Sequence, residues 1–281
     1  MIPEKYLKTL IERAYKEDVG NGDHSSLCCI NADELGKAKL LVKQGGIIAG
    51  VDVAKCVCDY FSNNLKLDVF IEDGNKIKPG DIVFEISGPQ LDILTAERTI
   101  LNFMQRMSGI ATETDKYVQL LSGLKTKVLD TRKTTPGLRL IEKEAVKIGG
   151  GENHRTGLYD MIMLKDNHID YSGGIEKAIL LANKYIEENK LDIKIEIETR
   201  SLSDVKEVLR VGKVHRIMLD NFTIEDTSQA VELINGRFET ESSGGINYDT
   251  IRNYAECGVD YVSVGALTHQ IKSLDLSLKA I

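Results

Sequence analysis

Charged side chains stand at the ends of several short apolar runs, and their types change in order along the chain. Cations come first and carboxylates follow: Arg132, Lys133, Lys165, Glu198 and Asp220. Guanidinium and ammonium groups bind carboxylate or phosphate, whereas carboxylates bind hydroxyl groups or a divalent cation. If the ends of these runs meet at one place, the sequence predicts a pocket for a polyanion there.

The runs that must position these side chains alternate with amphipathic helices. We expect strands at 126–130, 160–165, 193–198, 214–220, 237–241 and 260–264. We expect helices near 139–148, 174–189, 202–211, 224–235 and 248–257. This alternation is typical of parallel strands with right-handed crossovers. Because the chain has no GxGxxG fingerprint, it favours a barrel related to the (β/α)₈ type, in which the chemistry lies where the strands end.

The loops after the last two strands are rich in glycine and small residues. They read SSGGI (242–246) and VGALTH (264–269), and we expect the first to lead into a helix beginning near Asn247 and the second into a short helical stretch. Glycine lets backbone N–H groups approach a phosphate closely, and a helix start adds unpaired N–H donors. Phosphate sites in barrels of this class are often built from these two loops. We therefore expect a phosphate near Ser243, Gly244, Gly265 and Ala266.

A second dense cluster occupies GGGENHRTGLYDMIMLKDNH, residues 149–168. His154 and Arg155 follow three glycines, and Lys165 and His168 lie at the end of the next strand. Arginine is suited to bidentate binding of carboxylate or phosphate. Zinc binding by His154 and His168 is disfavoured, because no other Cys or His stands at a supporting spacing.

The first third of the chain has a different pattern. We expect a helix at 4–17, short strands between about 37 and 87 with a turn at 78–81, and then a long helical stretch to about 121. Gly109 lies within that stretch, and we expect it to break or bend the helix, because glycine costs about 1 kcal/mol in a helix interior.

The composition excludes several classes of protein. The 281 residues carry a net charge of −7, which argues against general binding of nucleic acids or anionic membranes. Five cysteines form no CxxC pair, so we expect reduced thiols rather than a disulfide framework or a zinc site. The N-terminus has no apolar signal core, and no run is long enough to span a membrane. We expect a soluble, cytoplasmic protein.

Seven segments, taken together, carry a resemblance to a known family. They are AERTILNFMQRMSGIAT, DTRKTTPGLR, GGGENHRTGLYDMIMLKDNH, IEIE, LDN, ESSGGI and VGALTH. In this order they resemble the quinolinate phosphoribosyltransferases, also called nicotinate-nucleotide pyrophosphorylases (carboxylating). The resemblance implies that pyridine-2,3-dicarboxylate reacts with phosphoribosyl pyrophosphate to give nicotinate mononucleotide, pyrophosphate and CO₂, with Mg²⁺ as helper, in NAD biosynthesis.

The resemblance also implies roles for individual residues. The dicarboxylate is expected to contact Arg98, Arg132, His154, Arg155 and Lys165. Phosphoribosyl pyrophosphate is expected to contact Lys133, Glu198, Asp220, Ser243, Gly244, Gly265 and Ala266. Lys133, Lys165, Glu198 and Asp220 are the expected catalytic residues, and Glu198 and Asp220 are also the possible, indirect magnesium ligands.

The family's architecture is an N-terminal α/β sandwich followed by an irregular TIM-like barrel. We accordingly expect domains at 1–112 and 113–270, with the tail at 271–281 packing back on the first domain. The resemblance further implies a homodimer with shared active sites, in which Arg98 reaches into the neighbouring subunit's barrel.

One departure from the family pattern concerns the residues after the expected sugar-binding glutamate. Arg200 stands where an acidic or small polar residue is expected. This leaves open whether Glu196 or Glu198 belongs to the site, because strand alternation puts both on the same face.

Three other interpretations were weighed. One is the molybdenum-transport-associated relative of the same fold, against which the intact NHRTGLYDMIMLKDNH segment argues. Another is a lipoyl- or biotinyl-carrier-like module, suggested by GNKIKPGDIVFEISG, which lacks a modifiable lysine between methionines. The segment VFIEDG (69–74) loosely resembles the ribose-phosphate motif of sheet-based phosphoribosyltransferases, but we interpret Glu72 and Asp73 as a surface turn.

Overall fold

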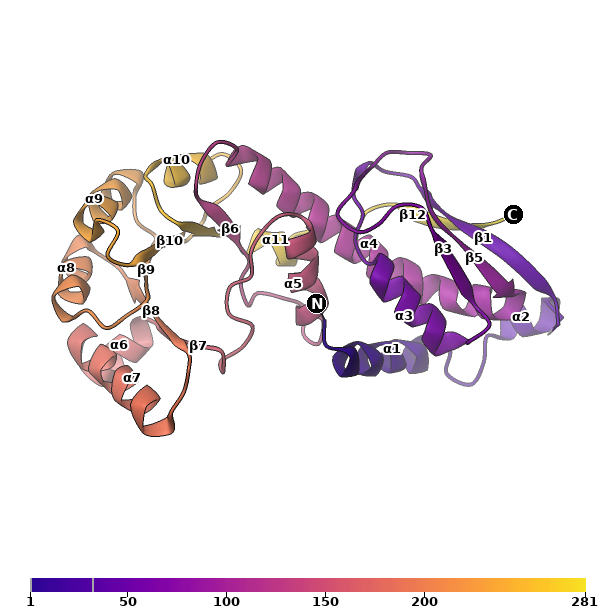
Figure 1. Cartoon of the computed structure of the whole chain (residues 1–281), viewed down its shortest axis with the longest axis horizontal. Coiled ribbons are helices and arrows are strands. Elements are labelled where there is room, and N and C mark those ends of the chain that lie inside the picture. Colours follow the sequence, from indigo (N-terminus) through magenta and orange to yellow (C-terminus); the bar gives the residue numbers. More distant parts are fainter. Residues whose placement is uncertain (1, 32) are drawn as a thin grey trace. The chain divides into compact units, whose positions relative to one another are not determined.

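The computed structural model describes residues 2–31 and 33–281. Contacts divide the chain into two compact units, and each is described by itself (Figure 1). Unit 1 comprises Met1–Asp115, Thr135–Gly150 and Gln270–Ile281, and unit 2 comprises Lys116–Thr134 and Gly151–His269. The units differ from the predicted domains mainly at residues 135–150, which were expected in the barrel and belong to unit 1.

Unit 1 is built around a four-stranded antiparallel sheet with the order β12-β1-β5-β3. The strands are β1 (Leu35–Val42), β3 (Lys66–Val69), β5 (Ile82–Pro89) and β12 (Leu276–Ala280), and a small separate sheet pairs β2 (Gly46–Ile47) with β4 (Lys76–Ile77). Alternate residues of β1 are buried, as a sheet with one covered face requires. β12 brings the C-terminal tail against β1, with Leu40 opposite Leu278.

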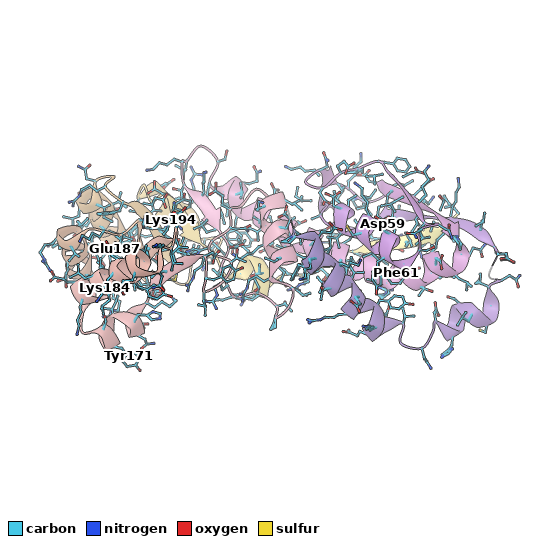
Figure 2. All side chains as sticks on the ribbon, turned by 60° about the horizontal axis from the view of Figure 1, so that its bottom comes forward. Asp59, Phe61, Tyr171, Lys184, Glu187 and Lys194 are labelled. Carbon is cyan, nitrogen blue, oxygen red and sulfur yellow. The ribbon has the colours of Figure 1, made fainter. Side chains whose placement is uncertain are left out.

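The helices of unit 1 are α1 (Glu4–Asp18), α2 (His24–Cys29), α3 (Val51–Phe61), the first part of α4 (Gln90–Leu120), and α5 (Arg139–Ile148). The sequence pattern missed α3 among the strand-like signals between 37 and 87. The cap of this helix comes from a distant segment, because Asp73 accepts the Val51 N–H at 2.9 Å. Phe61, at the end of α3 and labelled in Figure 2, packs edge-on against Tyr15 of α1 with ring centroids 5.0 Å apart.

The expected break at Gly109 is wrong, because α4 runs without interruption from Gln90 to Leu120. A Cβ at Gly109 would overlap the backbone carbonyl oxygen of Lys272. The glycine therefore allows the C-terminal tail to lie directly against the helix. Its cost in helix propensity is offset by this close packing, which sequence periodicity does not reveal.

Unit 2 contains a six-stranded parallel sheet with the order β6-β11-β10-β9-β8-β7. Its strands are β6 (Lys127–Leu129), β7 (Met161–Leu164), β8 (Lys194–Thr199), β9 (Arg216–Asp220), β10 (Glu239–Ser243) and β11 (Tyr261–Ser263). The helices are α6 (Asp166–Ser172), α7 (Ile175–Asn189), α8 (Leu202–Val211), α9 (Ile224–Ile234), α10 (Ile251–Glu256) and α11 (Ala266–His269). The expected α/β class with a parallel catalytic sheet is confirmed.

The sheet of unit 2 curves, and α6 to α10 lie on its outer side (Figure 1). Solvent-facing side chains of these helices, such as Lys184 and Glu187 on α7, are exposed (Figure 2). β6 and β7 are the two ends of the strand order and do not pair with each other. The segment before β7 runs along β6 instead, through a parallel bridge between Leu129 and Glu152. This irregular stretch carries His154 and Arg155.

Candidate active site

The charged side chains of unit 2 share one face of the sheet because of strand alternation and register. In β8, Ile195 and Ile197 alternate with Glu196 and Glu198, and all four are buried. Parallel pairing places Glu196 opposite Arg216 and, on the next strand, Asp220 opposite Ser243. Both glutamates that the sequence left open therefore lie on the inner face. Glu198 is nearer the carboxyl end of the strand, where the chemistry of such sheets takes place.

Lys165 and Glu198 form an ion pair at the carboxyl ends of β7 and β8. Glu198 is almost fully buried, whereas Lys165 is half-buried. The Lys165 N–H donates to Nδ1 of His168 at 3.0 Å, which fixes the start of α6. His168 thus has a structural role at a helix start, and the structure brings Lys165 and Glu198 together as the sequence predicted.

Asp220 accepts two side-chain hydrogen bonds at the ends of β9 and β10. The Ser243 hydroxyl donates to one carboxylate oxygen, and Nδ2 of Asn221 donates to the other at 2.7 Å. Gly244 follows with a φ of +97°, and a Cβ at this position would overlap the Asn221 side chain. Only glycine fits this turn without strain.

The loops after β6 and β11 are also in contact. The Thr268 hydroxyl donates to the backbone carbonyl of Lys133 at 2.8 Å. A Cβ on Gly265 would lie 3.2 Å from Cδ of Lys133, so a larger residue there would crowd the lysine. The structure thus brings Lys133 to the glycine and alanine at positions 265–266.

The expected helix starts after these loops are only partly observed. α10 begins at Ile251 rather than near Asn247, and α11 has only four residues. Gly244 and Gly245 have φ values of +97° and +62°, so the first loop turns sharply instead of entering a helix. Any phosphate held here would therefore be bound by loop N–H groups and not by the positive end of a long helix.

Asp130, at the end of β6, organises the segment that carries His154 and Arg155. Its buried carboxylate accepts the His154 N–H at 2.8 Å and the Asn153 side-chain amide at 2.6 Å. Arg155 is largely buried and donates to the Met161 carbonyl at 3.3 Å. Burial and the positive charge of nearby Arg132 lower the pKa of Arg155. A buried guanidinium group that experiences a second positive charge favours the binding of an anion.

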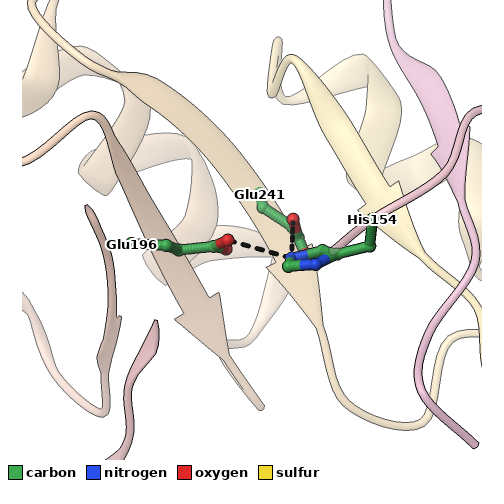
Figure 3. Close-up of side chains that lie close together, drawn as sticks. All are labelled: His154, Glu196 and Glu241. Atoms are coloured by element: carbon green, nitrogen blue, oxygen red, sulfur yellow. Dashed lines mark ion pairs between the residues drawn. The ribbon is translucent and has the colours of Figure 1, made fainter. Parts of the chain in front are cut away.

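Beneath this loop lies a buried polar cluster that sequence reasoning largely missed (Figure 3). Nε2 of His154 is 2.9 Å from Glu196 and 3.4 Å from Glu241. Arg216 lies 3.0 Å from Glu241 and 3.9 Å from Glu196. The signal available in the sequence was strand alternation, because Glu241 precedes Ser243 by two residues and Arg216 stands at the start of β9.

Carboxylates of this cluster have strongly shifted pKa values. Burial, reinforced by the charge of Glu241, raises the pKa of Glu196 to about 7. Burial also opposes ionisation of Glu241, but the hydrogen bond and charge of His154 and the charge of Arg216 hold its pKa below the usual range. The inner face of unit 2 is therefore a low-dielectric environment with balanced charges.

Three predicted features have other positions or partners. Arg98 lies on α4 in unit 1, with an exposed side chain. Arg200 pairs with Asp170 of α6 at 3.1 Å, so the departure noted after Glu198 is an exposed ion pair. Asp73 is not a simple surface-turn residue, because it caps α3 and burial raises its pKa to about 6. Glu72 is exposed, as expected.

The chain matches two family models that together span nearly all of it. Residues 23–108 match the N-terminal domain, and residues 110–279 the C-terminal domain, of quinolinate phosphoribosyl transferase. The predicted boundary at 112/113 lies close to the junction between these matches.

Several similar proteins span essentially the whole chain. A mitochondrial quinolinate phosphoribosyltransferase [decarboxylating] of Nicotiana tabacum is 44% identical over 99% of this chain and 83% of its own length. A probable nicotinate-nucleotide pyrophosphorylase [carboxylating] of Bacillus subtilis is 39% identical over 97% of this chain and 92% of its own length. The solved structure of the Francisella tularensis nicotinate-nucleotide pyrophosphorylase superposes with a TM-score of 0.94 at 39% identity, covering 100% of this chain and 98% of that one.

The order of the motifs, the cationic strand ends and the whole-length similarity agree with one another. The chain therefore belongs to the quinolinate phosphoribosyltransferase family.

Proposed function

We propose that this chain transfers the phosphoribosyl group of phosphoribosyl pyrophosphate to quinolinate and removes one carboxyl group as CO₂. The products are nicotinate mononucleotide and pyrophosphate. The observation that carries this proposal is the buried Arg155 guanidinium, whose pKa is lowered by burial and by the positive charge of Arg132 at the end of the first strand. A ligand with two adjacent carboxylates would satisfy both guanidinium groups. The names of the similar proteins support the same reaction.

In this proposal the two substrates use different parts of the inner face. Quinolinate is bound by Arg132, Arg155, His154 and Lys165, which come from the first two strand ends and the segment between them. The sugar and phosphates of the second substrate are bound by Lys133, Glu198, Asp220, Ser243, Gly244, Gly265 and Ala266. The contacts of Lys133 with the loop at 265–268, and of Asp220 with Ser243, favour a continuous second subsite.

The reaction needs positioning and charge more than an activated nucleophile. The pyridine nitrogen attacks the anomeric carbon, the bond to pyrophosphate breaks, and positive charge grows on the sugar as in other glycosyl transfers. Glu198 and Asp220 stabilise that charge, and Lys133 and Lys165 stabilise the departing pyrophosphate. The carboxylate on the adjacent ring carbon then departs as CO₂ and leaves its bonding electron pair on that carbon. The positive ring nitrogen stabilises this carbanion, and a proton from water completes nicotinate mononucleotide.

Magnesium is part of the proposal, and the donor set fits it. Glu198 and Asp220 offer hard oxygen ligands near the proposed sugar site, but neither belongs to a group of three possible protein ligands among the described residues. Mg²⁺ commonly binds one or two carboxylates and completes its shell with water and substrate phosphates. When bound, the ion would neutralise charge on the pyrophosphate.

Binding selectivity tests the proposed function. Isothermal titration calorimetry should show that the protein binds pyridine-2,3-dicarboxylate at least about 100-fold more tightly than nicotinate, because nicotinate lacks the second carboxylate and its charge-assisted hydrogen bonds. Product analysis should show one CO₂ released per nicotinate mononucleotide formed. Equal use of nicotinate would overturn the quinolinate assignment and favour another pyridine phosphoribosyltransferase.

We further propose a homodimer in which Arg98 completes the partner's site. The support is the family resemblance and the exposed position of Arg98 on α4. Mixing inactive Arg98→Ala and Lys133→Ala proteins under subunit exchange should restore up to about half of the activity per heterodimer, since one of its two sites is wild type. Heterodimers seen by mass spectrometry without recovered activity would refute a shared site.

The cytoplasmic location remains a prediction. Within the described residues, none of the helices combines the length and the apolar character needed to cross a bilayer. Some similar plant proteins carry mitochondrial or chloroplastic in their names, so location varies among relatives.

A further inference from the structure

A short chain of polar contacts, an ion pair followed by a hydrogen bond, leads from the buried interior of unit 2 to the backbone of Arg155. Nε2 of His154 lies 2.9 Å from a carboxylate oxygen of Glu196. On the other side of the ring, Nδ1 accepts the Arg155 N–H at 2.6 Å. The Arg155 N–H is donated to Nδ1, so Nε2 is the ring nitrogen that faces Glu196 (Figure 3), and in the neutral ring the proton is on Nε2. Glu196 therefore determines which ring nitrogen faces the Arg155 amide.

The second glutamate of the cluster has a different main partner. Glu241 lies 3.0 Å from Arg216 but 3.4 Å from the His154 ring, whereas Glu196 is 3.9 Å from Arg216. The Arg216 guanidinium also stacks 4.1 Å above the Tyr261 ring, which restricts its movement. Glu241 is thus held mainly by Arg216, and Glu196 is the carboxylate that is available to hold His154.

Burial makes this arrangement sensitive to the loss of any one partner. Glu196 is 0% and His154 is 7% exposed. Burial alone would lower the pKa of His154, but hydrogen bonds to Glu196 and Glu241 outweigh it and raise the pKa. A buried imidazole without an acceptor for its N–H loses more than the bond itself, because water cannot replace the partner. Without Glu196, a rotation of the His154 ring away from the Arg155 amide is therefore expected.

We propose that Glu196 is a positioning residue for quinolinate, acting through His154 to fix the backbone from which Arg155 reaches the substrate. Asp130 holds the same segment from the other end, through the His154 N–H at 2.8 Å. The residue pair His154–Arg155 is thereby anchored at two points, one in β6 and one in β8. The inference rests on the proposed function only in naming quinolinate as the ligand of Arg155.

The test compares three variants by calorimetric binding of quinolinate and of phosphoribosyl pyrophosphate. Glu196→Met removes the acceptor at similar size, and Glu196→Gln keeps an oxygen acceptor. The matched control is Glu239→Met. This variant removes a carboxylate that lies 3.0 Å from Arg216, whereas His154 pairs with Glu196 and Glu241. We expect Glu196→Met to weaken quinolinate binding at least tenfold and phosphoribosyl pyrophosphate binding less than twofold. Glu196→Gln should stay within about threefold of wild type, and Glu239→Met should change neither.

A spectroscopic measurement on the wild-type protein tests this chain of contacts even if Glu196→Met does not fold. The chain has five histidines, so the ¹⁵N signals of His154 can be assigned from their loss in His154→Gln. At a pH above about 9, where the His154 ring is neutral, we expect a protonated Nε2 and an unprotonated, hydrogen-bonded Nδ1 in the wild-type protein. Glu196→Met should mix the two tautomers or shift both signals, and Glu239→Met should not.

Four results would overturn the proposal. They are unchanged quinolinate affinity in Glu196→Met, equal weakening of the binding of both substrates, a neutral wild-type His154 ring with its proton on Nδ1, and a stoichiometric metal ion that depends on Glu196. If the wild-type protein fails to bind quinolinate at all, the proposed function fails instead. The ¹⁵N signals then still decide whether Glu196 positions His154.

Discussion

The sheets of the two units have opposite kinds of buried face. In unit 1, the buried residues of β1 and β5 are apolar, for example Leu40, Phe84 and Ile86. In unit 2, the strands bury Glu196, Glu198, Arg216 and Glu241 on one face. Buried charge costs stability unless it is paired, so a sheet that keeps so much of it is under selection for something besides stability. The unit 1 sheet thus buries an apolar face, whereas the unit 2 sheet buries a charged face that matches its proposed role in substrate binding.

The largest expected effect tests the apolar side of this comparison. Phe84→Ala, at a position that is 0% exposed, should lower the free energy of unfolding by about 3–5 kcal/mol, because it removes a large buried ring and leaves a cavity. Urea denaturation measures the loss. Phe70→Ala is the control, because that ring is 58% exposed and should cost little. Similar losses in both variants would mean that burial in unit 1 does not determine stability.

The next largest effect concerns the charged inner face of unit 2. Arg132→Ala and Arg155→Ala should each remove charge-assisted hydrogen bonds worth about 1.5–3 kcal/mol apiece, and so weaken quinolinate binding by about 10- to 100-fold or more. Arg132→Lys should also weaken binding, because the planar fork is lost. Calorimetry measures the affinity, and circular dichroism should show an intact fold. Arg210→Ala, which removes an exposed partner of Glu176, is the control. Wild-type affinity in both variants would refute the assignment.

A smaller effect concerns a half-buried carboxylate of unit 1. Burial raises the pKa of Asp73 from 3.8 to about 6, so folding favours its protonated form. The resulting cost is absent below pH 3.8, grows as the pH rises, and is complete above about pH 6. Asp73→Asn keeps an oxygen acceptor for the Val51 N–H without this cost. Relative to wild type, it should therefore gain about 1–2 kcal/mol of stability between pH 4 and pH 7. A pH-independent difference in urea denaturation would contradict the shifted pKa.

The smallest effect tests whether charges outside the inner face of unit 2 contribute to substrate binding. Arg200→Ala breaks an exposed ion pair with Asp170, and such pairs are worth about 0–1 kcal/mol. We expect almost unchanged stability and unchanged affinity for both substrates in the same assays. A marked loss of substrate affinity would extend the functional charges of unit 2 beyond its inner face.

The sequence by itself determined the fold class, the family and most of the residues now found near one another. The strand–helix alternation predicted a parallel sheet, and all six predicted strands of unit 2 differ from the observed ones by at most two residues at either end, β10 being shifted by two throughout. These features could be predicted because they depend on local periodicity, and because charged residues at strand ends are ordered along the chain.

The tertiary structure decided what depends on partners that are distant in sequence. Gly109 does not break α4, because its missing side chain makes room for the C-terminal tail. α3 begins at Val51 with a cap supplied by Asp73. Strand alternation could not distinguish Glu196 from Glu198. In the folded chain Glu196 pairs with His154 and Glu198 pairs with Lys165. Periodicity can place a side chain on a face, but only the folded chain determines which charges meet there and at what distance.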